Sequence, residues 1–465
     1  MVVLTLIGFH TAMAGTANSP NFEQLNTRFT VIASDVQLQL AQSRAKSLPK
    51  NDTIEQLESH TRKYLDQGDT INAVNLVLLN LNQIRTNLDN NAVLFFIDLL
   101  LDNNQLSVAT SLFEVVKKEG EKSLKSNTAL LFAKYYFHEN KWQECLQYIA
   151  DTYADLPENQ ANYARLITGV SLQHLKDHRK AISFYERIPG TSEYYLYARL
   201  NIAVGYIRQG WWTDAQATIN NTLKPGASLG TPPQEEMINR LYLVLGYSLL
   251  QKEYYRDARE AFRNIKTSSR YANRALLGIA LASANQDDLI GALNALAALK
   301  NKDNTDLSVD ESYLLYPFVY KKLGQELTAT TSYNEAIKYY QMRIDKLGKP
   351  YNMASSGLNA IKQTHDDYEL VINNNVFELS RELPESFMQN PARIAALLKA
   401  GSTLTSASSK KQISKLTDLQ QDYKTAYAAL ESSIISQRIE YLNSYMNQSR
   451  YGLANLFDSS LTEKK

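Results

Sequence analysis

Two copies of one pattern follow each other in residues 169–219, which read GVSLQHLKDHRKAISFYERIPGTSEYYLYARLNIAVGYIRQGWWTDAQATI. Gly169 and Ala181 in the first copy correspond to Ala203 and Ala215 in the second, 34 residues later. In both copies a bulky apolar residue follows the second small residue after four positions. Small residues at this spacing indicate two helices that cross closely, because larger side chains would hold the backbones apart. The stretch therefore predicts a helical hairpin that repeats.

The same pattern extends over most of the chain. Eight small residues, which we call the second column, are spaced 36, 36, 36, 34, 43, 34 and 37 residues apart: Ala73, Ala109, Cys145, Ala181, Ala215, Ala258, Ala292 and Ala329. The first column stands twelve residues before them: Thr61, Ile97, Ala133, Gly169, Ala203, Gly246, Ala280 and Pro317. Turn formers lie between the columns: Gly68, Asn104, Asn140, Gly210, Asp287 and Gly324. Such a period is typical of a solenoid, whose units bury their apolar faces against neighbours.

These columns resemble the tetratricopeptide repeat (TPR) family. The clearest matches to the family's pattern are Gly169, Leu172, Ala181 and Tyr185, and then Ala203, Tyr206, Gly210, Ala215 and Ile219. The resemblance covers residues 54–345 and implies an all-α fold, a right-handed superhelical α-solenoid of about eight TPR-like hairpins. Thr61 and Ile97 depart from the pattern, and Pro317 should kink its helix because it removes a helix hydrogen bond. The family serves many assemblies, so the resemblance predicts little about function.

The ends of the chain predict further segments. Residues 1–14 carry no charged side chain and end in an A-x-A cleavage pattern, which favours a signal peptide although a basic n-region is missing. We expect cleavage after Ala14 and a periplasmic protein; the alternative is an apolar N-terminus of a cytoplasmic protein. Residues 15–53 should form an N-terminal helical cap. An insertion at 224–233, rich in Pro and Gly, should be a loop.

The period is lost after Pro350. Residues 346–408 should form an irregular helical segment, because Gly357, Pro384 and Pro391 interrupt it. Residues 409–457 contain no proline and predict a long C-terminal helix, followed by a tail at 458–465. Apolar residues on this helix follow two phases, which leaves two interpretations open: a coiled coil with another chain, or packing back onto the repeats.

Composition and motifs argue against several function classes. The net charge is +1, from 49 basic and 48 acidic residues, so no field of one sign attracts nucleic acid or anionic membranes. Cys145 is the only cysteine and lies in the second column, which indicates a small buried hydrophobe. The sequence has no phosphate loop, H-E-x-x-H, C-x-x-C or G-x-S-x-G. His174 and His178 straddle an expected turn, and the cluster His365-Asp366-Asp367 fits a polar surface. We therefore expect no enzyme, no catalytic residue, no cofactor and no metal.

The first helix of each hairpin should line the concave side of the solenoid. Aromatic, apolar and basic side chains at these positions could anchor an extended or helical peptide: Phe137, Tyr163, Tyr197, Ile207, Arg240, Tyr247, Arg274 and Phe318. Alternatively, about half of the inner side chains belong to the core or contact the C-terminal segment. The basic and Asn positions by which some TPR domains clamp a carboxylate are not matched, since those slots hold Leu131, Ile167, Val244 and Leu315.

The sequence thus favours a non-enzymatic protein-interaction scaffold in the bacterial cell envelope, which binds a partner through the groove, the C-terminal helix or both. One alternative is an accessory subunit of an envelope enzyme or of a proton-channel-driven machine. Another is a cytoplasmic assembly adaptor. The expected partners are other proteins, with no nucleic acid and no membrane span in the mature chain. A homodimer through the C-terminal helix stays open.

Overall fold

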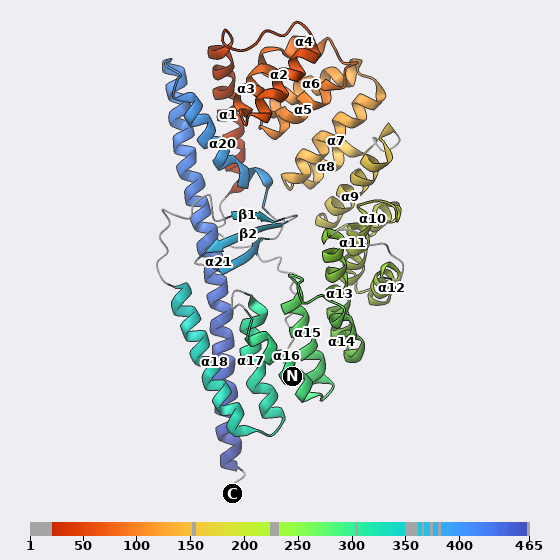
Figure 1. Cartoon of the computed structure of the whole chain (residues 1–465), viewed down its shortest axis with the longest axis vertical. Helices are drawn as coiled ribbons and strands as arrows, with labels where there is room; N and C mark the ends of the chain where they lie inside the picture. The colour runs from red at the N-terminus through yellow and green to blue at the C-terminus, as the bar shows by residue number, and fades with distance from the viewer. Residues whose placement is uncertain are drawn as a thin grey trace. The chain divides into compact units, whose positions relative to one another are not determined.

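A computed structural model of the chain describes residues 21–150, 155–223, 232–302, 306–348, 361–364, 367–372, 375–379 and 383–462 (Figure 1). The expected signal peptide, most of the insertion at 224–233 and the pair His365-Asp366 lie outside these residues. The chain divides into two compact units. The N-terminal unit contains Gly15–Tyr194 and Ser380–Ala429, and the second unit contains Tyr195–Leu379 and Leu430–Lys465.

The described part of the N-terminal unit is helical. Its helices are α1 (Phe22–Arg44), α2 (Ile54–Asp66), α3 (Thr70–Leu79), α4 (Leu81–Arg85), α5 (Ala92–Asp102), α6 (Leu106–Glu119), α7 (Lys122–His138), α8 (Trp142–Ile149), α9 (Glu158–His174), α10 (His178–Tyr185) and α20 (Glu385–Gly401). The first part of α21 (Ala407–Thr462) also belongs to this unit. The expected cap at residues 15–53 contains α1, which packs on α3 and α20.

The second unit continues the helical pairs and adds a small sheet. Its helices are α11 (Tyr195–Arg208), α12 (Trp212–Thr222), α13 (Pro232–Gln251), α14 (Tyr255–Arg263), α15 (Ala272–Asn285), α16 (Leu289–Lys300), α17 (Leu307–Lys322), α18 (Glu326–Leu347) and the rest of α21. The strands are β1 (Ile361–Thr364), β2 (Asp367–Ile372) and β3 (Asn375–Leu379). None of the helices in the described ranges is both long and apolar enough to cross a membrane.

Eight helical hairpins account for the predicted repeats in the described residues: α2–α3, α5–α6, α7–α8, α9–α10, α11–α12, α13–α14, α15–α16 and α17–α18. All eight second-column residues are 0% exposed, and the bulky residues four positions later are at most 3% exposed. Cys145 is among them, and burial raises the pKa of its thiol to about 11. The structure confirms the all-α helical-repeat fold.

The columns mark close crossings between helices. A Cβ at Gly169 would overlap the ring of Tyr185, the bulky residue of the same repeat. In the sixth repeat, the ring of Phe262 would overlap a Cβ at Gly246 and also one at Gly278 of the next repeat. The ring of Phe262 thus fills the space between two successive first helices. That space exists because Gly246 and Gly278 have no Cβ. Pro317 lies inside α17 and is buried.

Each hairpin turn contains one residue with left-handed backbone, five positions before the second column: Gly68, Asn104, Asn140, Lys176, Gly210, Glu253, Asp287 and Gly324. The sequence predicts six of these turns from their Gly, Asn or Asp residues. Lys176 and Glu253 were missed, because their types do not favour this conformation and the closing hairpin imposes it. In three repeats the next residue caps the following helix by accepting a backbone N–H: Asp69, Asp177 and Asp288.

The structure corrects the expectation for residues 346–408. Short helical segments were expected throughout, but residues 361–379 contain an antiparallel three-stranded sheet in the order β1-β2-β3. Ile361 pairs with Leu370, and Tyr368 pairs with Leu379. Polar and apolar residues alternate in Asp367–Leu370, a period of two that favours a strand. Gly357, Pro384 and Pro391, which suggested short helices, all lie outside the strands.

The long C-terminal helix expected at residues 409–457 is α21. The apolar residues of its first phase pack in the N-terminal unit. There the ring of Tyr423 stacks on that of Phe387 in α20, with 5.9 Å between the ring centroids. Its second phase packs in the second unit, where Leu442 and Met446 are buried with Tyr340 of α18 (Figure 1). Both phases therefore pack on helices of the same chain.

Candidate partner-binding site

Two of the predicted groove residues lie in the N-terminal unit. Phe137 and Tyr163 are half-buried. The ring of Phe137 meets Trp142 edge to face at 5.6 Å, and the ring of Tyr163 lies 5.6 Å from that of Tyr194. Both side chains therefore pack within the repeats and leave only part of their surface accessible.

The other six lie in the second unit. Tyr197, Ile207, Tyr247 and Arg240 are half-buried, whereas Arg274 is exposed and Phe318 is 37% exposed. The hydroxyl of Tyr247 donates to the backbone oxygen of Arg274 at 2.9 Å, so these two are brought together. Of the eight predicted residues, two thus belong to the N-terminal unit and six to the second unit.

A polar site does form on the first helices of repeats two and three. Positions one and five residues after the first column are Asp98 and Asp102 on α5, and Lys134 and His138 on α7. In the last four repeats the position one residue after the column is apolar or aromatic: Val204, Tyr247, Leu281 and Phe318. The inner face thus changes chemistry along the array.

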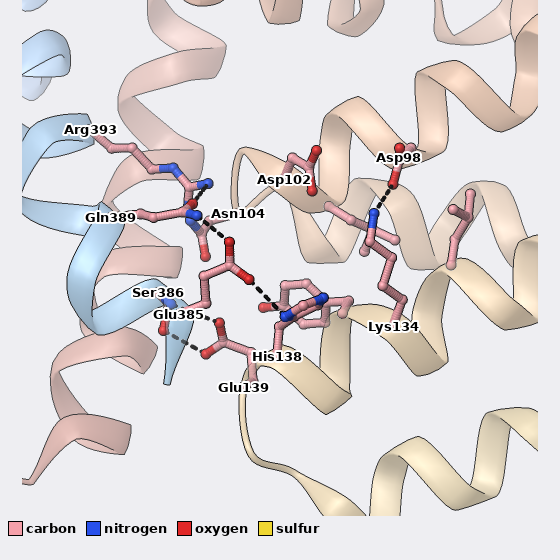
Figure 2. Close-up of a pocket in the computed structure, with 13 residues that line it drawn as sticks. Asp98, Asp102, Asn104, Lys134, His138, Glu139, Glu385, Ser386, Gln389 and Arg393 are labelled. Carbon is pink, nitrogen blue, oxygen red and sulfur yellow. Dashed lines mark hydrogen bonds and ion pairs between the residues drawn. The ribbon is translucent and has the colours of Figure 1, made fainter. Parts of the chain in front are cut away.

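Helix α20 lies against this polar face. A cavity of about 280 Å³ opens between α5, α7 and α20, and Figure 2 shows the side chains that converge on it. Its lining is Asp98, Leu101, Asp102, Asn104, Leu131, Lys134, Tyr135, His138, Glu139, Glu385, Ser386, Gln389 and Arg393. We call it the inner-face pocket. All of its residues belong to the N-terminal unit.

The start of α20 is fixed to the end of α7. His138 Nδ1 lies 2.9 Å from a carboxylate oxygen of Glu385. Glu139 is 8% exposed and accepts hydrogen bonds from the backbone N–H of Ser386 at 3.2 Å, from the Ser386 hydroxyl at 2.6 Å and from Asn26 at 2.7 Å. Burial raises the pKa of Glu139, while the bonds from Ser386 oppose that rise. The hydrogen bond from His138 lowers the pKa of Glu385.

Arg393 forms the back of the pocket. Its guanidinium donates to the side-chain oxygen of Gln389 at 2.5 Å and to that of Asn390 at 3.4 Å. Gln389 in turn donates to Glu385. Burial lowers the pKa of Arg393. The charges of the nearby carboxylates oppose this fall, and Asp102 has the largest effect among them. A guanidinium has five N–H donors, so Arg393 retains capacity for a further acceptor.

Asp102 is the most available group in the pocket. It is exposed and makes no hydrogen bond or ion pair with the residues that the structure describes. The pocket walls partly desolvate the carboxylate and so raise the pKa of Asp102. The neighbouring negative charge of Asp98 raises this pKa further. Asp98 itself forms a long ion pair with Lys134, at 3.8 Å. Two carboxylates of α5 therefore face the cavity with unused acceptor capacity.

The charges of the pocket favour a cation. Four carboxylates line it, against two permanently charged cations, Lys134 and Arg393. A volume of about 280 Å³ accommodates one long side chain or a small molecule. Among the described residues there is no group of three or more His, Cys, Asp or Glu that could hold a metal ion. The arrangement suits binding, with hydrogen-bond acceptors in fixed places.

None of the eight groove residues predicted from the sequence lines this pocket. The signal that could have found half of it is the polar pair at corresponding positions of two adjacent repeats, Asp98 with Asp102 and Lys134 with His138. The other half comes from α20, whose Glu385 follows His138 by 247 residues in the chain. No local pattern predicts that approach.

A second polar cluster lies buried in the second unit. Asp310 on α17 is 0% exposed, and its carboxylate lies 2.6 Å from a guanidinium nitrogen of Arg438 and 3.5 Å from Nε of Arg343. Tyr339 donates to the same carboxylate at 2.5 Å, and Tyr340 donates to the backbone oxygen of Asp310 at 2.7 Å. The side chain of Arg343 is 1% exposed. This cluster joins α17, α18 and α21 and is closed to a ligand.

The neighbouring Glu311 is also buried, at 7% exposed. Its carboxylate makes no hydrogen bond or ion pair within the described part of the chain, although its charge acts on Tyr247, Tyr340 and Tyr445. Burial raises the pKa of Glu311 to about 7. A carboxyl group of this kind changes charge near neutral pH.

No protein-family model matches the sequence, and no curated protein matches it. Solved structures with a similar arrangement include the apo form of RapI, with a TM-score of 0.42 and 11% identity over 81% of this chain and 98% of that chain. A STAND protein with a tetratricopeptide repeat sensor from Pyrococcus horikoshii has a TM-score of 0.39 and 15% identity, over 65% of this chain and 52% of that chain. The TPR domain of P58(IPK) has a TM-score of 0.23 and 13% identity, over 68% of this chain and 92% of that chain. The TPR-like fold of the chain rests on its own repeat columns, whose small and bulky residues are buried as the pattern requires.

Proposed function

We propose that the chain is a non-enzymatic scaffold that binds a protein partner at the inner face of its N-terminal unit. The observation that carries the proposal is the inner-face pocket, where Asp102 presents a carboxylate with unused acceptors to a cavity open to solvent. A basic side chain of the partner, Lys or Arg, suits this carboxylate in charge and in hydrogen-bond geometry. Helical-repeat arrays provide extended surfaces for such partners.

Asp102→Asn should weaken capture of the partner by about tenfold, because a charge-assisted hydrogen bond becomes a neutral one. The experiment is crosslinking pull-down from the native organism with the full chain as bait, followed by binding measurements on the purified partner. Asp66→Asn is the matched control, since Asp66 is exposed on α2 at the corresponding position of the first repeat and lies outside the pocket.

Partner capture that is equal for wild type and Asp102→Asn would contradict the role of the pocket. Equal weakening by Asp66→Asn would indicate a nonspecific effect of charge. Conversion of a small molecule by the purified chain would contradict the non-enzymatic assignment.

We further propose that the protein acts in the bacterial envelope. Support comes from the uncharged apolar run of residues 1–14 with its A-x-A end. N-terminal sequencing of protein made from its native upstream region should find a mature chain that begins near Gly15. An intact Met1 on protein recovered from the cytosol would exclude export.

A further inference from the structure

The start of α21 lies beside the last turns of α1. The two helices are antiparallel, because Arg28 of α1 lies 2.6 Å from Asp422, whereas Asp35, later in α1, accepts a hydrogen bond from the earlier Gln412 at 2.8 Å. At about 1.5 Å per residue, the first residue of α21 lies roughly 8 Å beyond this hydrogen bond, and the last residue of α1 lies roughly 14 Å beyond it. Both helix ends therefore extend to the same side.

Helix α20 ends at the same place. A Cβ at Gly401, its last residue, would overlap the side chain of Ile413 in α21 and would lie 4.0 Å from Val36 in α1. Gly401 is buried, and residues 402–406 lead from it directly into α21. The ends of α1 and α20 and the start of α21 therefore meet within the N-terminal unit (Figure 1).

The charged residues of these stretches are all positive. Residues 36–51 and 394–417 contain no Asp or Glu. Their basic residues, which we call the basic corner, are Arg44, Lys46, Lys50, Lys399, Lys410, Lys411 and Lys415. The lysines are exposed, and their side chains make no hydrogen bond or ion pair with the residues that the structure describes. The net charge of +1 for the whole chain hides this local excess, because the two stretches meet only in the fold.

An exposed leucine lies beside these lysines. Leu38 follows Asp35 by three positions, so it lies on the face of α1 that Gln412 contacts, next to the first turn of α21. It is 48% exposed, and Val31, one turn before Asp35 on the same face, is 60% exposed. Residues 36–51 and 394–417 contain no aromatic residue on which a nucleic-acid base could stack. Lysines around an exposed aliphatic side chain suit a surface that offers both negative charge and apolar contact.

We propose that the basic corner docks on the surface of an anionic phospholipid membrane. The ammonium groups of the lysines lie among the lipid phosphates, and Leu38 reaches the boundary between the headgroups and the acyl chains. Each lysine near such a surface contributes roughly fivefold to the affinity. The corner lies at the opposite end of α20 from the inner-face pocket, and its test uses no protein partner, so failure of this proposal would leave the proposed function untouched.

Cosedimentation of the full chain with lipid vesicles tests the proposal. We expect binding to phosphatidylcholine vesicles that contain about 30% phosphatidylglycerol, and none to vesicles of pure phosphatidylcholine. Binding should be lost at about 0.5 M NaCl, where charges are screened beyond about 4 Å. Equal binding to both kinds of vesicle, or to neither, would overturn the proposal.

Charge removal tests the position of the contact. Lys410→Gln/Lys411→Gln should bind the anionic vesicles about 25-fold more weakly, since two lysines of the basic corner lose their charge. The matched control is Lys118→Gln/Lys122→Gln, which removes two exposed lysines elsewhere in the same unit and should bind as the wild type. Equal weakening by the two double variants would show that the contact depends on overall charge, against the proposal.

A variant of the exposed leucine separates a membrane from a soluble polyanion. Leu38→Gln should weaken binding to the anionic vesicles by about threefold, because an apolar contact is lost, and should leave binding to a short DNA duplex unchanged. Tighter binding of the wild type to the duplex than to vesicles of equal phosphate concentration would assign the basic corner to nucleic acid and overturn the proposal.

Discussion

Asp310→Asn should lower the free energy of unfolding by about 3–5 kcal/mol, the usual cost of removing one partner of a buried ion pair. The carboxylate is fully buried and lies 2.6 Å from Arg438 and 3.5 Å from Arg343. Asparagine keeps the shape of the side chain but removes the charge, so both guanidiniums lose this counter-charge in a region without bulk water. Urea unfolding at pH 7, followed by circular dichroism, measures the change.

Asp287→Asn is the matched control, because it removes the partner of Lys322 in an ion pair whose aspartate is 83% exposed. That change should cost less than about 1 kcal/mol. In a double-mutant cycle, adding Arg343→Met to Asp310→Asn should cost less than the sum of the single changes, since the charges disappear together. Additive losses would show that Asp310 and Arg343 do not depend on each other.

Glu311→Gln should stabilise the protein above neutral pH. Burial raises the folded-state pKa of Glu311 to about 7 from its ordinary value of 4.5, so the folded chain binds this proton more tightly than the unfolded chain. The wild type therefore loses stability as pH rises from about 4.5 to about 7, and the loss persists above that range. Glutamine stays neutral at every pH. At pH 8 the variant should be more stable by about 3 kcal/mol.

Urea unfolding at pH 5 and pH 8 checks this result. The difference between variant and wild type should be small at pH 5 and large at pH 8. Glu326→Gln, at an exposed position at the start of α18, should change neither value. A gain from Glu311→Gln that is the same at both pH values would mean that the titration of this carboxyl group is not its cause.

The repeat fold could be predicted from the sequence because its determinants are local. The small second-column residues and the bulky residues after them are buried as the pattern requires, and six of the eight turns follow from Gly, Asn or Asp. Lys176 and Glu253 could not be identified in this way. The packing of the two helices imposes their left-handed conformation against their own preference.

The inner-face pocket and the buried cluster could not be predicted, because both depend on distant segments. Glu385 and Arg393 reach the pocket only because α20 returns to α5 and α7. In the sequence, Asp310 is an ordinary polar residue near the start of a helix. Its ion pair with Arg438 forms only because α21 packs beside α17. The eight predicted groove residues came from helix periodicity, which fixes a face of a helix but not what covers that face. For this reason several of them are half-buried.

The membership of Ser380–Ala429 in the N-terminal unit has a consequence for synthesis of the chain. Repeats one to four leave the ribosome long before α20 and the first part of α21 exist. At about 5–20 residues per second, the interval between residues 194 and 429 takes roughly 10 to 50 s. During that time the side chains of α1 and α3 that later pack on α20, such as Phe22 against Phe387, face water. We therefore expect the unit to reach its final stability only after nearly the whole chain has been made, with its N-terminal half exposed to association until then.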